Sequence, residues 1–307
     1  MFKDIKVAII GLSGQSIFLN VDEFHKPGET ITAKELFIEP GGKGYNQAAC
    51  LLKLGARVSY LSSIGDDSYG KVCFDYLNQQ KAKLYFKKTQ SKTALATILT
   101  NRDGDNQVTV FRGASEKINL NHLNDFKKEI ISSDILLLTL EPNLEVVEEA
   151  IKIAKANGVM VILNPAPFNK EFKLYDMCDV IIPNEIEAKD IFGLSPTSDF
   201  KKEIDNVIKT TYFKENFKKV IITIGNKGSL LIDNEETFHI NGLKVNTIDT
   251  TGAGDVFNAS FAYFYANTND LKIAAHYANI AAAVSTTQKH VLNSLPSLEE
   301  ILSYKQI

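Results

Sequence analysis

The segment 249–255 reads Asp-Thr-Thr-Gly-Ala-Gly-Asp, and its residue types and spacing suit the binding of an anion and catalysis beside it. It follows a short β-branched stretch at 245–248 and leads into residues whose apolar positions recur at helical spacing. Residues 252–254 let the backbone turn tightly and leave N–H groups at a helix N-terminus, where they and the helix dipole bind anions. A carboxylate repels an anion bound beside it, so we interpret Asp255 as a general base next to a phosphoryl group. A plain helix cap at Thr251 or Asp255 is the alternative.

A second glycine-rich segment opens another helical pattern and reads Gly41-Gly42-Lys43-Gly44-Tyr45-Asn46. Its glycines allow the backbone to approach a ligand closely. Lys43 and Asn46 lie near the same helix N-terminus, so they suit recognition of hydroxyl or phosphate groups. A simple turn followed by a helix cap, with no role in binding, would produce the same sequence pattern and is the alternative.

Polar residues also follow several apolar strands, where parallel sheets bind their ligands beyond the carboxyl ends. These residues are Glu141, Asn164, Asn184, Glu187, Thr223, Gly225 and Gly228. Asn184 and Glu187 are spaced to share one helix face. Glu187 is a candidate to hold hydrated Mg²⁺, and an Asn cap with a solvated acid is the alternative.

Apolar strands and amphipathic helices alternate along the chain, which predicts a single α/β domain over 1–307 with a doubly wound, mostly parallel sheet. The expected strands are 7–10, 58–64, 135–140, 159–163, 180–182 and 220–224. The expected helices are 45–54, 69–79, 144–156, 185–192 and a lysine-rich stretch near 201–216, with a late helix at 276–287.

Two segments depart from this alternation, 15–40 and 84–113. The second contains two β-rich runs with a turn at 102–105, and it predicts a hairpin. We expect the two segments to pair as a small antiparallel sheet that projects from the main body.

Composition narrows the function classes. A net charge of −3 argues against nucleic acid as a partner, and 44% hydrophobic with 23% charged residues are ordinary for a globular protein. Three widely spaced cysteines and five histidines without helical pairing predict neither a disulfide framework nor a zinc site. We find no apolar stretch that predicts a membrane span and no leader pattern, so we expect a cytoplasmic protein.

In this order and spacing, the motifs resemble the ribokinase-like (PfkB-type) carbohydrate kinases, and within them the ribokinases. The likeness covers essentially the whole chain. The segments at 41–46 and 249–255 carry it, and 27–30, 164–167 and 183–185 add to it. It implies an ATP-dependent kinase with Mg²⁺ and a monovalent cation such as K⁺, acting on a sugar hydroxymethyl group. It also implies a lid that forms the contact of a homodimer.

The resemblance implies a role for each matching residue. Asp255 would be the catalytic base, and the amides of Gly252, Ala253 and Gly254 would form the anion hole. Sugar hydroxyls would contact Gly41, Gly42, Lys43, Asn46, Glu141 and Asp255. The nucleotide would contact Asn184, Thr223, Gly225, Gly228, Gly254 and Asn279. Glu187 would hold Mg²⁺ through water, and Asp249 and Thr251 would belong to the monovalent-cation site.

Two positions depart from the family pattern. Gly14 and Ser16 stand where these kinases usually carry an Asn and an Asp that hold the sugar. Loss of a charged acceptor predicts weak binding of ribose, and Gly14→Asn with Ser16→Asp should improve it. A nucleoside or pseudouridine kinase, a hexose or sugar-phosphate kinase and a nucleotide-binding protein without catalysis remain as alternatives. Lys289-His290-Val291 replaces a frequent glycine near the cation site.

Overall fold

The computed structural model describes residues 3–102, 105–193, 200–233 and 236–304. Nine strands belong to the larger of its two sheets: β1 (Lys6–Ile10), β4 (Arg57–Gly65), β5 (Lys83–Thr89), β8 (Ile135–Thr139), β9 (Met160–Asn164), β10 (Val180–Ile181), β11 (Lys219–Thr223), β12 (Gly228–Asp233) and β13 (Glu236–Asn241). The α-helices are α1 (Lys43–Lys53), α2 (Ser68–Gln79), α3 (Leu120–Ile131), α4 (Leu144–Ala156), α5 (Glu185–Phe192), α6 (Phe200–Val207), α7 (Thr211–Asn216), α8 (Ala253–Thr268), α9 (Leu271–Ser285) and α10 (Leu298–Ser303).

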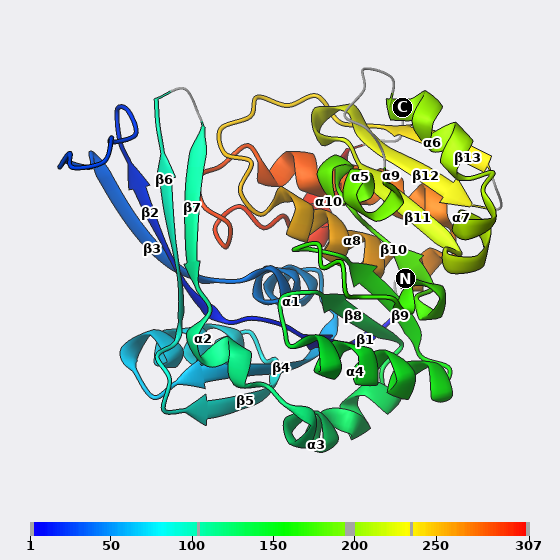
Figure 1. The fold of residues 1–307 in the computed structure, drawn as a ribbon, viewed down its shortest axis with the longest axis horizontal. Helices are drawn as coiled ribbons and strands as arrows, with labels where there is room; N and C mark the ends of the chain where they lie inside the picture. Colours follow the sequence, from blue (N-terminus) through cyan, green and yellow to red (C-terminus); the bar gives the residue numbers. More distant parts are fainter. Residues whose placement is uncertain (1–2, 103–104, 194–199, 234–235, 305–307) are drawn as a thin grey trace.

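This larger sheet, the central sheet, has the strand order β13-β12-β11-β10-β9-β8-β1-β4-β5. Strands β11 to β5 in that order pair in parallel, and β12 and β13 are added antiparallel at one edge. The expected doubly wound, mostly parallel sheet is therefore confirmed (Figure 1).

Helices cover both faces of the central sheet because its strands are apolar on both sides. On β1, Val7 and Ile9 pack into a core with residues of α1, α8 and α9. Ala8 and Ile10 point the other way, into a core with residues of α3 and α4. The strand β1 lies between β4 and β8, so the chain reverses its direction of winding there. Ligands of such sheets bind at the carboxyl ends beside this switch point.

A second sheet stands off one end of the central sheet, and we name it the lid sheet (Figure 1). It consists of β2 (Gly14–Asn20), β3 (Glu35–Gly41), β6 (Ala94–Thr100) and β7 (Asn106–Phe111), in the order β3-β2-β6-β7. β2 pairs with β3 antiparallel and with β6 in parallel, so the two predicted segments do pair. The strands within each segment are antiparallel as expected, but the pairing between the two segments is parallel. The predicted lid boundary at residue 84 is wrong, because β5 belongs to the central sheet and the second lid segment begins at Ala94.

Other differences from the sequence expectation are local. The stretch near 201–216 forms two helices, α6 and α7, because Thr210 caps a new helix by accepting from the Phe213 amide. The hairpin of β6 and β7 is present, and its predicted turn at 102–105 includes residues 103–104, which lie outside the described residues. Helix α3 and the β12–β13 hairpin were not predicted.

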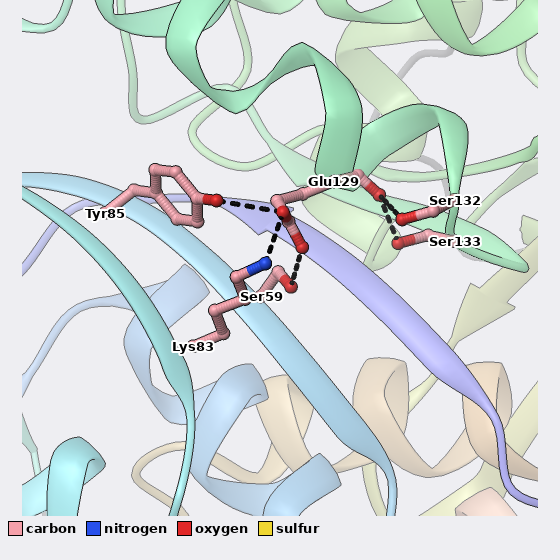
Figure 2. A network of polar contacts seen from close by, with 6 residues as sticks. All are labelled: Ser59, Lys83, Tyr85, Glu129, Ser132 and Ser133. Atoms are coloured by element: carbon pink, nitrogen blue, oxygen red, sulfur yellow. Dashed lines mark hydrogen bonds and ion pairs between the residues drawn. The ribbon is translucent and has the colours of Figure 1, made fainter.

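A polar cluster fixes α3 to the edge of the central sheet (Figure 2). The Glu129 carboxylate accepts from Lys83 Nζ at 2.6 Å and from the Tyr85 hydroxyl at 2.8 Å, both on β5. It also accepts from the Ser59 hydroxyl on β4 at 2.9 Å. One largely buried carboxylate thus joins a helix to two strands.

Within the described ranges, no helix is long and apolar enough to cross a membrane.

Candidate active site

The segment 249–255 folds as a tight loop that opens α8, and we name residues 252–254 the anion loop. Gly252 is the N-cap with φ 76°, and its cap makes no side-chain hydrogen bond. A Cβ on Gly252 would lie 2.6 Å from Val291 Cγ1, so only glycine fits there, whereas a Cβ on Gly254 would meet open space. The Ala253 amide donates to the Thr250 carbonyl at 3.2 Å, so the next two amides of α8, those of Gly254 and Asp255, are the ones placed for an anion that approaches from the Gly254 side.

Asp255 follows the anion loop and is only 7% exposed. Asn46 Nδ2 donates to its Oδ2 at 2.8 Å. Burial raises the pKa of Asp255 to about 6, while the nearby Lys43 charge and the Asn46 bond act in the opposite direction. A carboxylate with this pKa is mostly ionised at neutral pH and is better able to take a proton than an exposed one.

Glu141 and Lys43 join the end of β8 to the start of α1. The Glu141 carboxylate accepts from the Lys43 amide at 3.1 Å and from the Gly44 amide at 3.2 Å. The charges of Asp255, Glu141 and Glu187 raise the pKa of Lys43 against its burial. Lys43 therefore stays cationic among three acids. Both Glu141 oxygens are engaged by α1, so its contact with a sugar stays a prediction.

The start of α1 also presents acceptors without partners. Asn46 Oδ1 and Gln47 Oε1 are buried and have no hydrogen-bond partner in the described structure. A Cβ on Gly41 would lie 3.8 Å from Asn46 Oδ1 and 2.7 Å from Ser16 Oγ, so these two oxygens both lie beside Gly41, where the lid sheet meets α1. Buried polar atoms normally find partners, and a hydroxylated ligand would supply them here.

Gly14 cannot be replaced as the sequence suggested. A Cβ at Gly14 would lie 2.5 Å from the Ala94 carbonyl oxygen and 2.9 Å from Ala94 Cβ, because β2 and β6 approach closely there. Gly14→Asn would therefore push β6 away and not restore a sugar contact. Ser16 is partly exposed and lies opposite Glu39 on β3, so Ser16→Asp would place a second carboxylate across from the Glu39 carboxylate.

Asn184 and Glu187 form a capping box at the start of α5. Asn184 Oδ1 accepts from the Glu187 amide at 2.8 Å, and Glu187 Oε2 accepts from the Asn184 amide at 2.9 Å. Burial raises the pKa of Glu187, and the hydrogen bond from the Asn184 amide and the Lys43 charge act in the opposite direction. The cap that the sequence left as the alternative is present. It does not exclude a metal role, because the second Glu187 oxygen takes no part in the box.

The other predicted nucleotide residues lie farther along the same edge. Asn184 and Thr223 are bridge partners across β10 and β11. Gly225 has open space around it, whereas a Cβ on Gly228 would meet the Ile240 carbonyl. The last predicted nucleotide residue is Asn279, whose Nδ2 donates to Ser229 Oγ at 3.1 Å and to the Ile240 carbonyl at 3.2 Å. Asn279 therefore holds α9 against the β12–β13 hairpin, and its contact with a nucleotide stays a prediction.

Asp249 and Thr251 organise the loop before α8. Asp249 Oδ1 accepts from the Thr251 amide at 2.9 Å, and Oδ2 accepts from the His290 amide at 3.1 Å. The described part of the chain contains no group of three or more His, Cys, Asp or Glu side chains placed to hold a metal ion. A cation at this loop would have to rely on backbone and hydroxyl oxygens, and it stays a prediction.

Sequence reasoning missed Glu39, and it missed the contact that Val291 makes with the anion loop. Glu39 is a lid residue that is 5% exposed, and Val291 packs on Gly252. The only signal for Glu39 was an acid between Ile38 and Pro40, just before the first glycine-rich segment. Its partners lie about 250 residues away, which no local pattern reveals.

Comparison with known proteins matches residues 4–298 to the pfkB family carbohydrate kinases. The ribokinase of Haemophilus influenzae is 33% identical over 303 residues, covering 97% of each chain. The deoxyribokinase of Salmonella typhi is 30% identical over 302 residues, covering 97% of this chain and 98% of the relative. The structure of Arabidopsis thaliana ribokinase complexed with ribose and ATP superposes with a TM-score of 0.85 at 26% identity, covering 98% of both chains.

Proposed function

Because the chain belongs to the pfkB family of carbohydrate kinases, we propose that it transfers the terminal phosphate of ATP to a hydroxymethyl group of a ribose-like sugar. The family assignment makes it a phosphotransferase with an alcohol acceptor. The observation that carries the proposal is the buried Asp255 at the start of α8, directly after an anion loop that is open at Gly254.

The reaction follows from these parts. Asp255 takes the proton of the sugar hydroxyl as its oxygen forms a bond to the terminal phosphorus, and the bond between that phosphorus and the ADP oxygen breaks. The amides of Gly252, Ala253 and Gly254 stabilise the charge that develops on the transferring group. Lys43 adds a positive charge beside Asp255, which keeps the base ionised until it is used.

The nucleotide and ions have candidate residues at the same edge of the sheet. ATP would lie along Asn184, Thr223, Gly225, Gly228 and Asn279, with its terminal phosphate at the anion loop. Glu187 would hold Mg²⁺ through water, and the metal would neutralise phosphate charge when bound. Asp249 and Thr251 would border a monovalent cation such as K⁺, which would stiffen the loop before α8.

The sugar would lie between the lid sheet and the start of α1, against Gly41, Gly42, Lys43, Asn46 and Glu141. The unpartnered Asn46 Oδ1 supports a hydroxyl there. A second candidate substrate is 2-deoxyribose, because the pocket carries Ser16 in place of a carboxylate and so has one strong acceptor fewer. The deoxyribokinase relative is 30% identical to the chain, which is consistent with this candidate.

The test is a coupled ADP-release assay with ATP and Mg²⁺ over ribose, 2-deoxyribose, hexoses, a sugar phosphate, adenosine and pseudouridine. We expect turnover with one or both pentoses and little with the others. Turnover confined to nucleosides or hexoses would replace the proposed substrate class. The absence of turnover with every acceptor would leave a nucleotide-binding protein without catalysis.

Ser16→Asp should increase kcat/KM for ribose relative to 2-deoxyribose, by about tenfold for a charge-assisted hydrogen bond.

We also propose that the protein is a homodimer in the cytoplasm. Leu36 and Ile38 on β3 and Phe111 on β7 are 63%, 44% and 56% exposed and lie on the face of the lid sheet opposite Glu39. Exposed apolar faces of this kind usually mark an interaction surface, and a second copy of the lid is our candidate occupant. The cysteines at 50, 73 and 178 are free and buried, which suits a reducing compartment.

A further inference from the structure

A buried acid on the lid sheet, Glu39, holds a loop far away in the sequence. Its Oε1 accepts from the Val291 amide at 2.8 Å, and its Oε2 accepts from the Leu292 amide at 3.0 Å. Both oxygens of a carboxylate that is 5% exposed are therefore committed to two consecutive amides of the segment between α9 and α10. Charge-assisted bonds of this kind are among the stronger contacts in a protein.

The same segment contacts the anion loop. Val291 packs its side chain directly on Gly252, where any Cβ would lie 2.6 Å from Val291 Cγ1. The neighbouring His290 amide donates to Asp249 Oδ2 at 3.1 Å, and Asp249 Oδ1 accepts from Thr251. Three successive amides, 290 to 292, thus donate to carboxylates of two different segments: the loop before α8 and the lid strand β3.

Ring contacts reinforce the junction. The His290 ring stacks on Phe37 of β3, with ring centroids 3.4 Å apart and planes 15° from parallel, and it meets Phe18 of β2 edge-on. His290 adopts φ 71°, a left-handed conformation that non-glycine residues avoid unless their surroundings hold them there. By contrast, the outer contact between Lys289 and Glu35 is an exposed ion pair at 2.9 Å.

We propose that Glu39 is a positioning residue that couples the lid sheet to the anion loop through Val291. When β3 moves toward or away from the pocket, its carboxylate carries the amides of Val291 and Leu292 with it. The Val291 side chain then shifts against Gly252, the residue that sets the entry angle of α8. This inference rests on the proposed role of residues 252–254 in holding the transferring phosphate.

An alternative role for Glu39 is simpler: it could only anchor the lid sheet to the body of the protein. The two roles predict different kinetics. An anchor for the lid should change the KM for the sugar and leave the chemical step alone. A residue that positions the anion loop should lower kcat, because the amides that stabilise the transferring phosphate are displaced.

The first experiment is hydrogen exchange by mass spectrometry on the full chain, without substrates. Glu39→Gln keeps the volume but removes the charge and turns one acceptor into an NH₂ group that faces an amide donor. We expect faster exchange in peptides covering 286–294 and 249–256. The control is Glu35→Gln, on the same strand and toward the same segment, which should leave both peptides at the wild-type rate. Wild-type exchange at 249–256 in Glu39→Gln would overturn the proposal.

The second measurement uses Val291→Ala, which keeps the amide that Glu39 holds and removes the contact with Gly252. If Glu39→Gln does not fold, this variant alone decides: we expect faster exchange at 249–256 with β3 unchanged, and wild-type exchange there would contradict the coupling. In the kinetic cycle, Glu39→Gln should lower kcat about tenfold, the size of one lost charge-assisted contact, and Val291→Ala should lower kcat as well. The double variant should fall little further, because both act through one contact. Fully additive effects would show that Glu39 acts elsewhere.

The exchange result separates this proposal from the proposed function. If the wild-type protein phosphorylates no acceptor, the proposed function is wrong. The coupling between β3 and residues 249–256 is still tested by hydrogen exchange, which needs no substrate. If the wild-type protein is active and Glu39→Gln changes only the KM for the sugar, the function stands and the coupling is wrong.

Discussion

At the scale of single residues, the candidate site is a set of charges that adjust one another. Asp255, Glu141 and Glu187 surround Lys43, and each acid raises the pKa of that amine. Asp255 is destabilised by its burial, and Lys43 and Asn46 offset only part of that cost. A carboxylate whose charged form is disfavoured in this way is expected where a base must accept a proton. Its charge does not contribute to the stability of the fold.

Replacement of Asp255 by Asn tests its role as the base. Asn has the same shape but cannot take a proton, so kcat should fall at least ~10²-fold. The affinity for ATP, measured by calorimetry, should change little. Because the raised pKa of Asp255 means that its charged form is disfavoured in the fold, the melting temperature at pH 8 should not decrease. Substantial turnover by a folded Asp255→Asn variant would remove this residue from the mechanism.

The pH dependence of kcat/KM should report the same carboxylate. Because the pKa of Asp255 is raised to about 6, the profile should rise with pH and level off above that value. Lys43 lowers this pKa, so Lys43→Gln should move the acid limb to higher pH. Glu141 raises it, so Glu141→Gln should move the limb to lower pH. Shifts of the same sign in both variants would show that another group controls the profile.

Glu187→Gln tests the metal role without breaking the helix cap. The Gln side-chain carbonyl can still accept from the Asn184 amide, so α5 should begin as before. Loss of the charge should raise the Mg²⁺ concentration for half-maximal activity several-fold. The matched control is Glu185→Gln, two residues earlier in the first turn of the same helix, which should leave the Mg²⁺ titration unchanged. Identical titrations for both variants would return Glu187 to a purely structural role.

At the scale of elements, Glu129 should stabilise the attachment of α3 to β4 and β5. Burial raises its pKa, but hydrogen bonds from Lys83, Tyr85 and Ser59 outweigh burial and lower the pKa overall. A lowered pKa contributes stability that is present above the unfolded value near 4.5 and is lost as the pH falls through the folded value.

Glu129→Gln should therefore reduce the free energy of unfolding at pH 7 by about 1–3 kcal/mol, measured in urea. The difference from wild type should shrink as the pH falls below 4. Asp125→Asn, on the same helix with an exposed ion pair to Lys87, should have little effect at either pH. A Glu129 effect that is equal at pH 7 and pH 3.5 would rule out the charge as its origin.

The elements that the sequence predicted well are those whose surroundings are uniform. β1, β8 and β11 are buried on both faces, so they read as unbroken apolar runs, and α5 was predicted with its observed bounds. β5 was assigned to the lid because, as an edge strand with three lysines and no fully buried residue, it lacks the unbroken apolar run of the inner strands. The two glycine-rich segments reveal the site because their backbone geometry needs glycine. Glu39 could not be recognised, because its role depends on a contact between residues 39 and 291.

At the scale of the whole molecule, one sheet supplies a rigid edge and the other supplies a cover. The central sheet brings Glu141, Asn184 and Thr223 to its carboxyl edge, and α8 adds Asp255 from a later part of the chain. The lid sheet reaches the same place from two insertions, before α1 and before α3. One face of the lid carries Ser16 and Glu39 toward the pocket. The opposite face carries exposed apolar side chains and needs an explanation of its own.

That opposite face predicts the oligomeric state. Ile38→Asp places a charge on the apolar face, where burial against a second lid would leave the carboxylate without water or a partner. The wild-type protein should sediment as a dimer at micromolar concentration, and Ile38→Asp should shift it to a monomer. Val108→Asp is the matched control: Val108 is 53% exposed on β7 but pairs with Ile98 on the pocket-facing side, so the dimer should persist. A wild-type monomer, or an Ile38→Asp dimer with native melting behaviour, would show that the lid face meets some other partner.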